Sequence, residues 1–201
     1  MRKYLPKTYQ FENIINKSRF ITYFYPITSY KHGQELLAQL KIEHPKANHH
    51  CYALRVLSEN SERFSDDGEP NKTAGFPMLD VLQKNNLDEI LVVVVRYFGG
   101  IKLGAGGLTR AYRSCVASNI KELPLVEKVE TTIFSLTVDY TLADSISHLL
   151  KQTNNFLVKT NYDLQVSFEY YSFNENLNNQ LIELSGGIKP LASRTIKVIK
   201  D

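Results

Sequence analysis

The stretch ILVVVVRYFGGIKLGAGGLTRAYRSCVASNI spans residues 90–120 and carries the strongest structural signal in the chain. Its first six residues are apolar on both faces and rich in β-branched side chains, which predicts a strand buried in the middle of a sheet. From Gly107 onward, apolar residues recur at helical spacing and predict a helix with one face against that sheet. A glycine-rich corner between a central strand and a helix therefore decides the fold of the first half.

The residues before this stretch predict the other elements of the first half. Tyr- and Phe-rich segments on both sides of a polar break at residues 16–19 indicate a β-hairpin within residues 9–27. Ser29 is a suitable N-cap for a helix that His44-Pro45 ends. The remaining predicted elements are a strand at 51–57, a turn at 66–70 and a short helix near 77–84.

The second half begins after a charged, proline-containing segment, KELPLVEKVE at residues 121–130. Such a segment is typical of a domain boundary, so we predict one domain at residues 1–126 and another at 127–201. The hydrophobic pattern of the second domain predicts strands and helices in the order βαββαβ, at residues 132–139, 142–152, 156–162, 164–172, 176–184 and 190–198. This order indicates a ferredoxin-like unit, with two helices on one face of a four-stranded antiparallel sheet. The predicted fold class is α+β with two domains.

The composition of the 201 residues limits the class of protein. With 43% hydrophobic and 22% charged residues, the chain matches globular usage and not that of a disordered protein. Its longest apolar run, residues 90–95, is too short to span a membrane, and residues 1–14 lack the apolar stretch of a signal peptide. Cys51 and Cys115 lie in apolar patterns, so we expect both to be buried and reduced. We therefore expect a cytoplasmic protein without membrane contact.

Positive charge is concentrated in the first half of the chain. The formal net charge is only +3, which by itself does not indicate a nucleic-acid partner. Residues 1–126, however, hold seventeen Lys and Arg against twelve Asp and Glu, a balance of +5, whereas residues 127–201 hold seven against nine, a balance of −2. No acidic residue occurs in residues 90–121. The cations of this acid-free segment are Arg96, Lys102, Arg110, Arg113 and Lys121.

The corner GGIKLGAGGLTR, residues 99–110, follows a predicted strand and opens a predicted helix. In that position backbone amides and the positive end of a helix can face an anion. The glycine spacing completes neither a P-loop nor a dinucleotide-binding fingerprint. Arg110 and Arg113 lie three residues apart and could clamp phosphates. The alternatives are glycines that only permit a tight backbone corner and arginines on a solvated helix face.

A second candidate site, SDDGEPNKTAG at residues 65–75, gathers Asp66, Asp67 and Glu69 beside two glycines. An acidic cluster of this kind can bind Mg²⁺ or supply an acid and a base. The same residues are also typical of a charged turn that hydrogen-bonds its own backbone. Both interpretations stay open at this point, and we expect no cofactor.

A third candidate is the group formed by His44, His49, His50 and Cys51. Neighbouring residues of a strand point to opposite faces, so the last three could not all bind one ion. We therefore expect no zinc site. No GxSxG sequence occurs, and no base can be identified that would activate Ser65 as a nucleophile.

Several of these strings together resemble the Impact/YigZ family. They are KSRFI, SDDGEP followed by TAG and PML, and VVVVRYFGGIKLGAGGL followed by RAY. The resemblance implies a first domain similar to the second domain of ribosomal protein S-five and a second domain similar to a late domain of elongation factor G. It also implies a role in translation. Eukaryotic members restrain a starvation-responsive kinase by competing for its activator, and bacterial members are regarded as nucleic-acid or ribosome binders.

The residues that match the family motifs fall in three blocks. They are Ser18, Arg19 and Phe20; then 66–70 and 73–75; then 96–100, 102–104, 106–108, Arg110 and Tyr112. We expect these blocks to converge on one surface. The chain departs from the family pattern at Asn71-Lys72, where a small residue and a glycine are usual, so a positive φ at Lys72 would be strained.

Three functions are compatible with these patterns. The first is a binding protein in translation that contacts RNA or the ribosome through Arg19, Arg96, Gly99, Gly100, Lys102, Gly104, Gly106, Gly107, Arg110 and Arg113. The second is an enzyme for a small phosphorylated substrate, with Asp66, Asp67 or Glu69 as base or metal ligand. The third is an adaptor that docks a protein partner. A simpler alternative is that Arg96 pairs with Asp66 or Asp67 and only holds two loops together.

Overall fold

The computed structural model describes residues 2–152 and 155–199. Its chain forms two compact α+β units, the first built from the chain up to Lys128 and the second from Val129–Val198. The boundary predicted from the sequence, between residues 126 and 127, lies two residues before this division.

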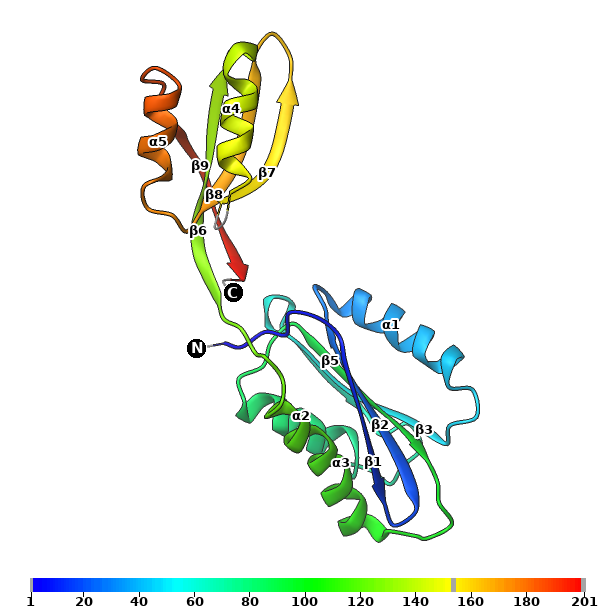
Figure 1. Ribbon diagram of the computed structural model, residues 1–201. Helices are drawn as coiled ribbons and strands as arrows, with labels where there is room; N and C mark the ends of the chain where they lie inside the picture. The colour runs from blue at the N-terminus through cyan, green and yellow to red at the C-terminus, as the bar shows by residue number, and fades with distance from the viewer. Residues whose placement is uncertain (1, 153–154, 200–201) are drawn as a thin grey trace. The chain divides into compact units, whose positions relative to one another are not determined.

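Unit 1 is a five-stranded antiparallel sheet with helices on both faces. The strand order is β1-β2-β5-β3-β4, with α2 and α3 on one face and α1 on the other (Figure 1). The strands are β1 (Tyr9–Ile15), β2 (Ser18–Pro26), β3 (His49–Val56), β4 (Ser61–Ser65) and β5 (Ile90–Tyr97). The helices are α1 (Tyr30–Glu43), α2 (Gly75–Lys84) and α3 (Gly104–Ile120), with a 3₁₀ turn at Leu57–Glu59.

Strand β5 lies in the middle of the sheet, as its apolar sequence predicts. Val92 and Val94 are buried in the core that α2 and α3 cover. Leu91, Val93 and Val95 are buried in a second core under α1. A strand with helices on both faces needs apolar side chains at every position, which explains why residues 90–95 show no polar alternation.

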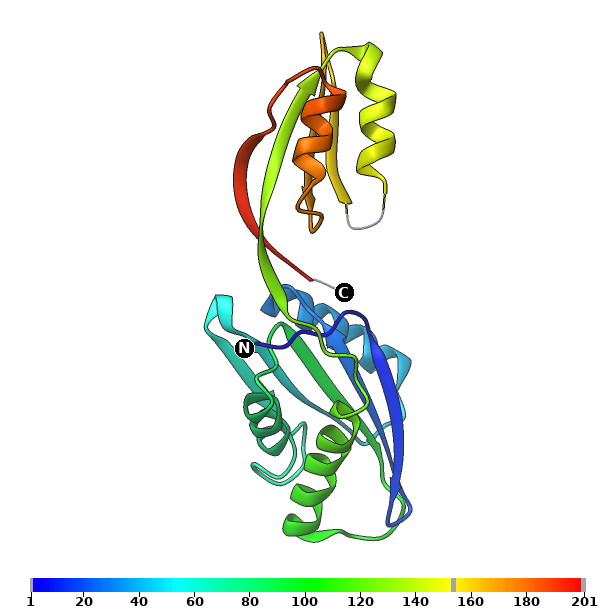
Figure 2. The same ribbon diagram turned by 60° about the vertical axis from the view of Figure 1, so that its left-hand side comes forward.

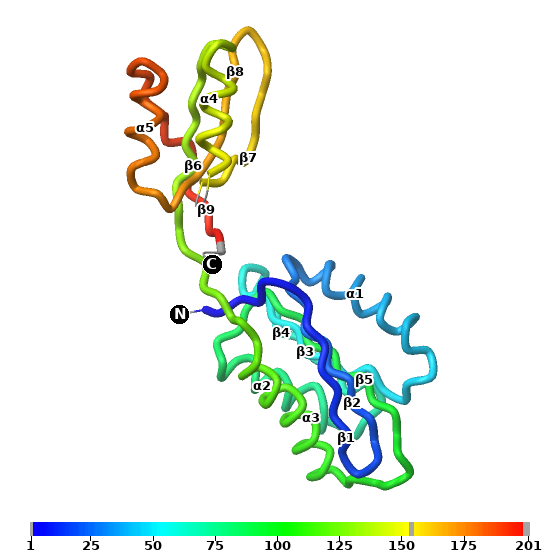
Figure 3. The backbone as a smooth tube through the Cα atoms, viewed as in Figure 1, coloured from blue at the N-terminus to red at the C-terminus, as the bar shows by residue number. Residues whose placement is uncertain are grey.

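Strands β1 and β2 form the predicted hairpin and run side by side in Figure 3. Ile15 pairs with Ser18, so only Asn16 and Lys17 form the turn. Their φ angles of 47° and 63° are those of a two-residue turn of type I′, which suits the twist of a hairpin. The predicted break at residues 16–19 is therefore too long, because Ser18 and Arg19 already belong to β2.

Three elements of unit 1 differ from the sequence-based prediction. Strand β4 was missed because SERFS is short and polar; it lies at the edge of the sheet and pairs with β3. Strand β3 begins at His49, two residues before its predicted start. Helix α3 begins at Gly104 and not at Gly107, since its first turn contains no large apolar side chain from which a periodicity could be detected.

Unit 2 has the predicted βαββαβ order. Its elements are β6 (Lys128–Val138), α4 (Tyr140–Leu150), β7 (Asn155–Tyr162), β8 (Val166–Ser172), α5 (Leu177–Leu184) and β9 (Leu191–Ile199). The sheet order β7-β8-β6-β9 is that of a ferredoxin-like unit, with α4 and α5 on one face (Figure 2). Strand β8 starts two residues after the predicted Leu164, which is 93% exposed. Among the described residues, no helix is long and apolar enough to cross a membrane.

Gly99 lies where the corner after β5 approaches the β1–β2 turn. A Cβ atom at this position would come within 2.0 Å of the carbonyl carbon and oxygen of Lys17 and 2.4 Å of the Ser18 nitrogen. No side chain can occupy that space. At Gly106, by contrast, a Cβ atom would meet only the tip of the Arg110 side chain, at 3.7 Å. Two glycines of one motif therefore have different roles.

We predict that Gly99→Ala lowers the free energy of unfolding by about 1–3 kcal/mol, because the turn must move to admit the methyl group. Gly106→Ala is the matched control in the first turn of α3, and it should be neutral or stabilising by up to about 1 kcal/mol. Urea unfolding measures both effects. Equal stability of the two variants would contradict the close approach at Gly99.

Candidate nucleic-acid interface

A buried ion pair joins the acidic loop to the central strand. Arg96, near the end of β5, is 4% exposed, and Glu69 is 9% exposed. The Arg96 Nη1 donates to Glu69 Oε1 at 2.5 Å, and the hydroxyl of Tyr112 on α3 donates to the same oxygen at 2.8 Å. The partner of Arg96 is therefore Glu69, and neither Asp66 nor Asp67, because the loop directs those two carboxylates elsewhere.

This ion pair is part of a larger buried network. The Sγ of Cys51 on β3 lies 3.3 Å from the Tyr112 hydroxyl, and burial raises the pKa values of both groups well above their ordinary range. Ser18 on β2 accepts a hydrogen bond from Arg96 Nη2 at 3.3 Å. The network therefore connects all three motif blocks, through Ser18, Glu69, Arg96 and Tyr112, and also includes Cys51. Cys51 and Cys115 are both free and buried, as expected.

His49 also lies beside this network, although sequence reasoning had not assigned it a role. It is directly opposite Arg96 in the β3–β5 pairing, which places both side chains on the same face of the sheet. Its Nδ1 lies 2.9 Å from the carbonyl oxygen of Asp67, and its Nε2 lies 3.8 Å from Glu69 Oε1. The position of His49 in the strand register is the signal that could have found it, but only once β3 and β5 are known to be neighbours.

Asp66 holds the start of α2. Its Oδ1 accepts hydrogen bonds from the backbone N–H groups of Ala74 and Gly75, at 3.0 Å and 2.9 Å. Its Oδ2 accepts from the N–H of Lys72 at 2.7 Å. The first N–H groups of a helix have no partner within the helix, so a carboxylate here satisfies them and complements the helix dipole.

Asp67 fastens the same loop to β3 and α1. Its side chain accepts hydrogen bonds from the N–H of His50 at 2.6 Å and from the Nζ of Lys41 at 3.1 Å. Burial alone would raise the pKa of Asp67, but these two donors hold it below its ordinary value. The carboxylates of Asp66, Asp67 and Glu69 thus each have their own structural partners.

These contacts bear on the interpretation of the acidic loop as a metal or acid–base cluster. Within the described part of the chain, no group of three His, Cys, Asp or Glu side chains is placed to hold a metal ion. The hydrogen bonds of the three carboxylates are of the kind expected for the alternative interpretation, a charged turn. Its acids accept hydrogen bonds from backbone amides, Lys41 and Arg96.

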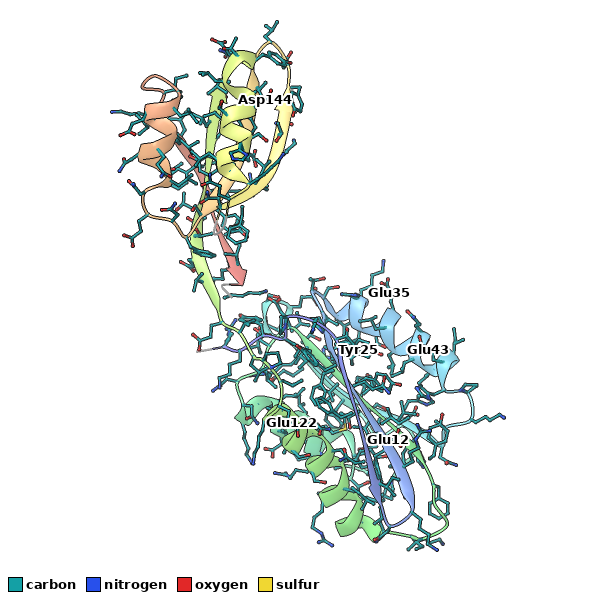
Figure 4. All side chains as sticks on the ribbon, in the orientation of Figure 1. Glu12, Tyr25, Glu35, Glu43, Glu122 and Asp144 are labelled. Atoms are coloured by element: carbon teal, nitrogen blue, oxygen red, sulfur yellow. The ribbon has the colours of Figure 1, made fainter. Side chains whose placement is uncertain are left out.

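The predicted basic residues divide into paired and unpaired side chains. Arg113 on α3 pairs with Asp80 on α2 at 2.9 Å. Arg19 pairs with Glu12 at 2.7 Å and lies over the ring of Tyr97 (Glu12 is labelled on β1 in Figure 4). The hydrogen bond from Arg19 lowers the pKa of Glu12. Lys102 and Arg110 are exposed and make no ion pair with any described residue.

Two backbone hydrogen bonds hold the corner between β5 and α3 against neighbouring segments of unit 1, and its other side is exposed to solvent. The N–H of Phe98 donates to Asn48 Oδ1 at 2.8 Å, and that of Gly99 donates to Ser18 Oγ at 3.2 Å. Gly100 and Gly104 have positive φ angles of 85° and 67°, which glycine adopts without strain.

Helix α3 presents its first turn to solvent. Residues 104–106 are exposed, and among the described residues no side chain caps this end of the helix. Gly106 and Gly107 have no positive φ and belong to that first turn. Backbone N–H groups and the positive end of the helix dipole are therefore available to an anion.

Two hollows flank the first turn of α3 and share Leu103. The first, about 280 Å³, is lined by Glu69, Pro70, Arg96, Phe98, Lys102, Leu103, Gly104, Ala105 and Leu108. The second, about 320 Å³, is lined by Ile15, Asn16, Leu103, Gly107, Arg110, Ala111 and Ser114. Motif residues that are far apart in the sequence therefore line one continuous region of unit 1.

Comparison with known proteins identifies relatives of this chain and a domain family that includes the region described above. Residues 16–120 match the Impact N-terminal domain. The chain is 39% identical over 181 residues to IMPACT family member YvyE of Bacillus subtilis, covering 88% of this chain and 83% of that protein. It is 38% identical over 151 residues to IMPACT family member YigZ of Escherichia coli, covering 74% of each. A crystal structure described as a hypothetical protein is 32% identical, with a TM-score of 0.68 over 96% of this chain and 98% of its own.

The fold and the site define a two-unit α+β protein whose first unit is an Impact N-terminal domain. The matched residues include the whole buried network and the exposed corner described above. The chain belongs to the IMPACT family, which confirms the resemblance drawn from its motifs.

The buried pair leads to a stability prediction. Glu69→Gln keeps the shape of the side chain but leaves the Arg96 charge buried without a counter-charge, so we expect the free energy of unfolding to fall by about 3 kcal/mol or more. Glu122→Gln is the matched control, since Glu122 is exposed (labelled in Figure 4). That control should stay within about 0.5 kcal/mol of the wild type. Similar urea midpoints for the two variants would show that the pair does not hold the loops.

Lys72 has a φ of 60°, so the strain that the sequence analysis attached to a positive φ at this position applies. A residue with a side chain is strained there by about 1–2 kcal/mol, whereas glycine is not. We predict that Lys72→Gly stabilises the protein by about 1 kcal/mol, because the N–H bond to Asp66 is retained. Lys46→Gly, at an exposed turn position outside the left-handed region, should not stabilise it. The melting temperatures of the two variants test this prediction. A melting temperature of Lys72→Gly below that of the wild type would contradict backbone strain at Lys72.

Proposed function

We propose that this protein binds RNA through the first turn of α3 and the exposed cations beside it, and that this contact serves translation. The observation that carries the proposal is the uncapped, solvent-exposed start of a 17-residue helix in a segment without acidic residues. An N-terminal helix turn attracts phosphate oxygens through its N–H groups and its dipole. Lys102 and Arg110 add positive charge on either side of Leu103.

We propose different roles for the residues that the sequence grouped together, supported by their contacts. Lys102 and Arg110 are the proposed phosphate contacts, with the backbone of residues 104–107 between them. Arg113 can join them only by sharing its charge with Asp80, and Arg19 only by leaving Glu12. Arg96 has a structural role in the proposed site and is not a phosphate contact, because its charge is already compensated by Glu69.

The glycines divide in the same way. Gly104, Gly106 and Gly107 belong to the exposed turn and would lie against the RNA backbone. Gly99 is needed for contact with the β1–β2 turn, and Gly100 for its positive φ. Only part of the motif is therefore proposed to touch the ligand, while the remainder shapes the corner.

The link to translation rests on the family. The resemblance implies that eukaryotic members regulate translation, and bacterial members are regarded as nucleic-acid or ribosome binders. Ribosomal RNA is the most abundant phosphate surface that such a protein would meet, so we propose ribosomes as the first partner to test. An enzymatic role for the acidic loop finds no support, since its three carboxylates are engaged in structural contacts.

Co-sedimentation with purified ribosomes over a salt series tests this proposal. We expect binding at low salt that weakens steeply as salt rises. The slope of log affinity against log salt should become shallower by about 1.4–1.8 in the Lys102→Ala/Arg110→Ala double variant, because each lost phosphate contact contributes about 0.7–0.9. The matched control, Lys31→Ala/Arg63→Ala, removes the same charges from exposed sites on α1 and β4 and should keep the wild-type slope. Absence of binding at the lowest salt would contradict the proposal.

A further inference from the structure

We propose that the hollow of about 280 Å³ beside the first turn of α3 receives one unpaired nucleobase of a single-stranded RNA segment. This inference rests on the proposed function and narrows it to RNA with accessible bases. Ligand sites usually enclose about 300–1,000 Å³, so this hollow lies just below that range and suits one flat ring system.

The hollow offers an aromatic platform. Phe98 is 46% exposed although it follows the buried strand β5, and its backbone is held by the hydrogen bond to Asn48. The guanidinium carbon of Arg96 lies 5.6 Å from the centroid of the Phe98 ring. An exposed aromatic ring on a fixed backbone is well suited to stack with a base, because little conformational freedom is lost on binding.

Apolar side chains form much of the remaining wall. Pro70, Leu103 and Leu108 line the hollow together with Phe98. A phosphate alone would gain nothing from such walls, since they offer it no hydrogen bonds. A nucleobase gains from them, because its two faces are apolar while its edge is polar.

Polar groups that could meet a base edge also line the hollow. The hydrogen bonds that Glu69 accepts from described residues all go to Oε1, which leaves Oε2 without such a partner. The Nε of Arg96 also makes no hydrogen bond to the described part of the chain, but it is buried, so Oε2 of Glu69 is the atom proposed to meet a base edge. A carboxylate oxygen accepts a hydrogen bond from an exocyclic amino group, which cytosine carries and uracil lacks.

The charges around the hollow suit an RNA strand. The Glu69 charge is compensated by Arg96, so the hollow does not repel an anionic ligand as a free carboxylate would. Lys102 and the exposed residues Gly104 and Ala105 line the same hollow, and Arg110 lines the second hollow across Leu103. A strand whose base enters the first hollow would thus have its phosphates beside the first turn of α3. A duplex could not bind in this way, since its bases are paired and stacked.

Fluorescence anisotropy with short labelled RNAs tests the inference. We expect oligocytidylate to bind more tightly than oligouridylate of the same length, and both to bind more tightly than a blunt RNA duplex. Phe98→Ala should weaken oligocytidylate binding by about 5- to 150-fold, the range expected for loss of one base stack. Phe76→Ala is the matched control, because Phe76 is 47% exposed on α2 and does not line the hollow.

A second readout separates stacking from loss of fold. A 2-aminopurine placed in the oligonucleotide should be quenched on binding to the wild type and to Phe98→Trp, but not to Phe98→Ala. Duplex and single strand binding equally well, with Phe98→Ala unchanged, would overturn the nucleobase inference and leave the phosphate contacts of the proposed function standing. Absence of binding by every RNA at low salt would instead overturn both.

Discussion

The buried ion pair between Glu69 and Arg96 is the interaction on which the rest of unit 1 depends. Removing two charges from water is costly, and the cost is offset only where the geometry is good and further hydrogen bonds satisfy the remaining groups. Here Tyr112 and Ser18 provide two such bonds, whereas the Nε of Arg96 makes none to the described residues. Because the four residues come from the acidic loop, β5, α3 and β2, the pair can form only when these segments are all in place.

This constraint separates residues that build the site from residues that would act in it. The acids of residues 66–69 resemble a reactive cluster in the sequence. In the structure, their carboxylates form hydrogen bonds and ion pairs with backbone amides, Lys41 and Arg96. The hydrogen bonds from Phe98 to Asn48 and from Gly99 to Ser18 hold the corner after β5 in place, and Phe98, Lys102 and Arg110 are exposed there. A rigid support carrying exposed cations and an aromatic ring is the arrangement expected of a binding surface, because such a surface needs its groups ordered before the ligand arrives.

Local patterns were sufficient for much of the fold and for less of the site. The central position of β5 followed from its continuous apolar run, and the ferredoxin-like order of unit 2 from its alternating elements. Strand β4 could not be predicted, since SERFS has no apolar alternation and is stabilised by pairing with β3. The partner of Arg96 could not be predicted either, because spacing alone does not distinguish three carboxylates within four residues. Gly99 and Gly106 are the same residue type in one motif, and their different roles become visible only from the atoms that surround each of them in the structure.

The most direct test of the account is hydrogen–deuterium exchange of the whole protein with and without oligocytidylate. The account predicts slower exchange at the amides of residues 98–107, in the corner and the first turn of α3, with α1 and unit 2 unchanged. Slower exchange confined to α1 or unit 2, under conditions in which the RNA is bound, would contradict it.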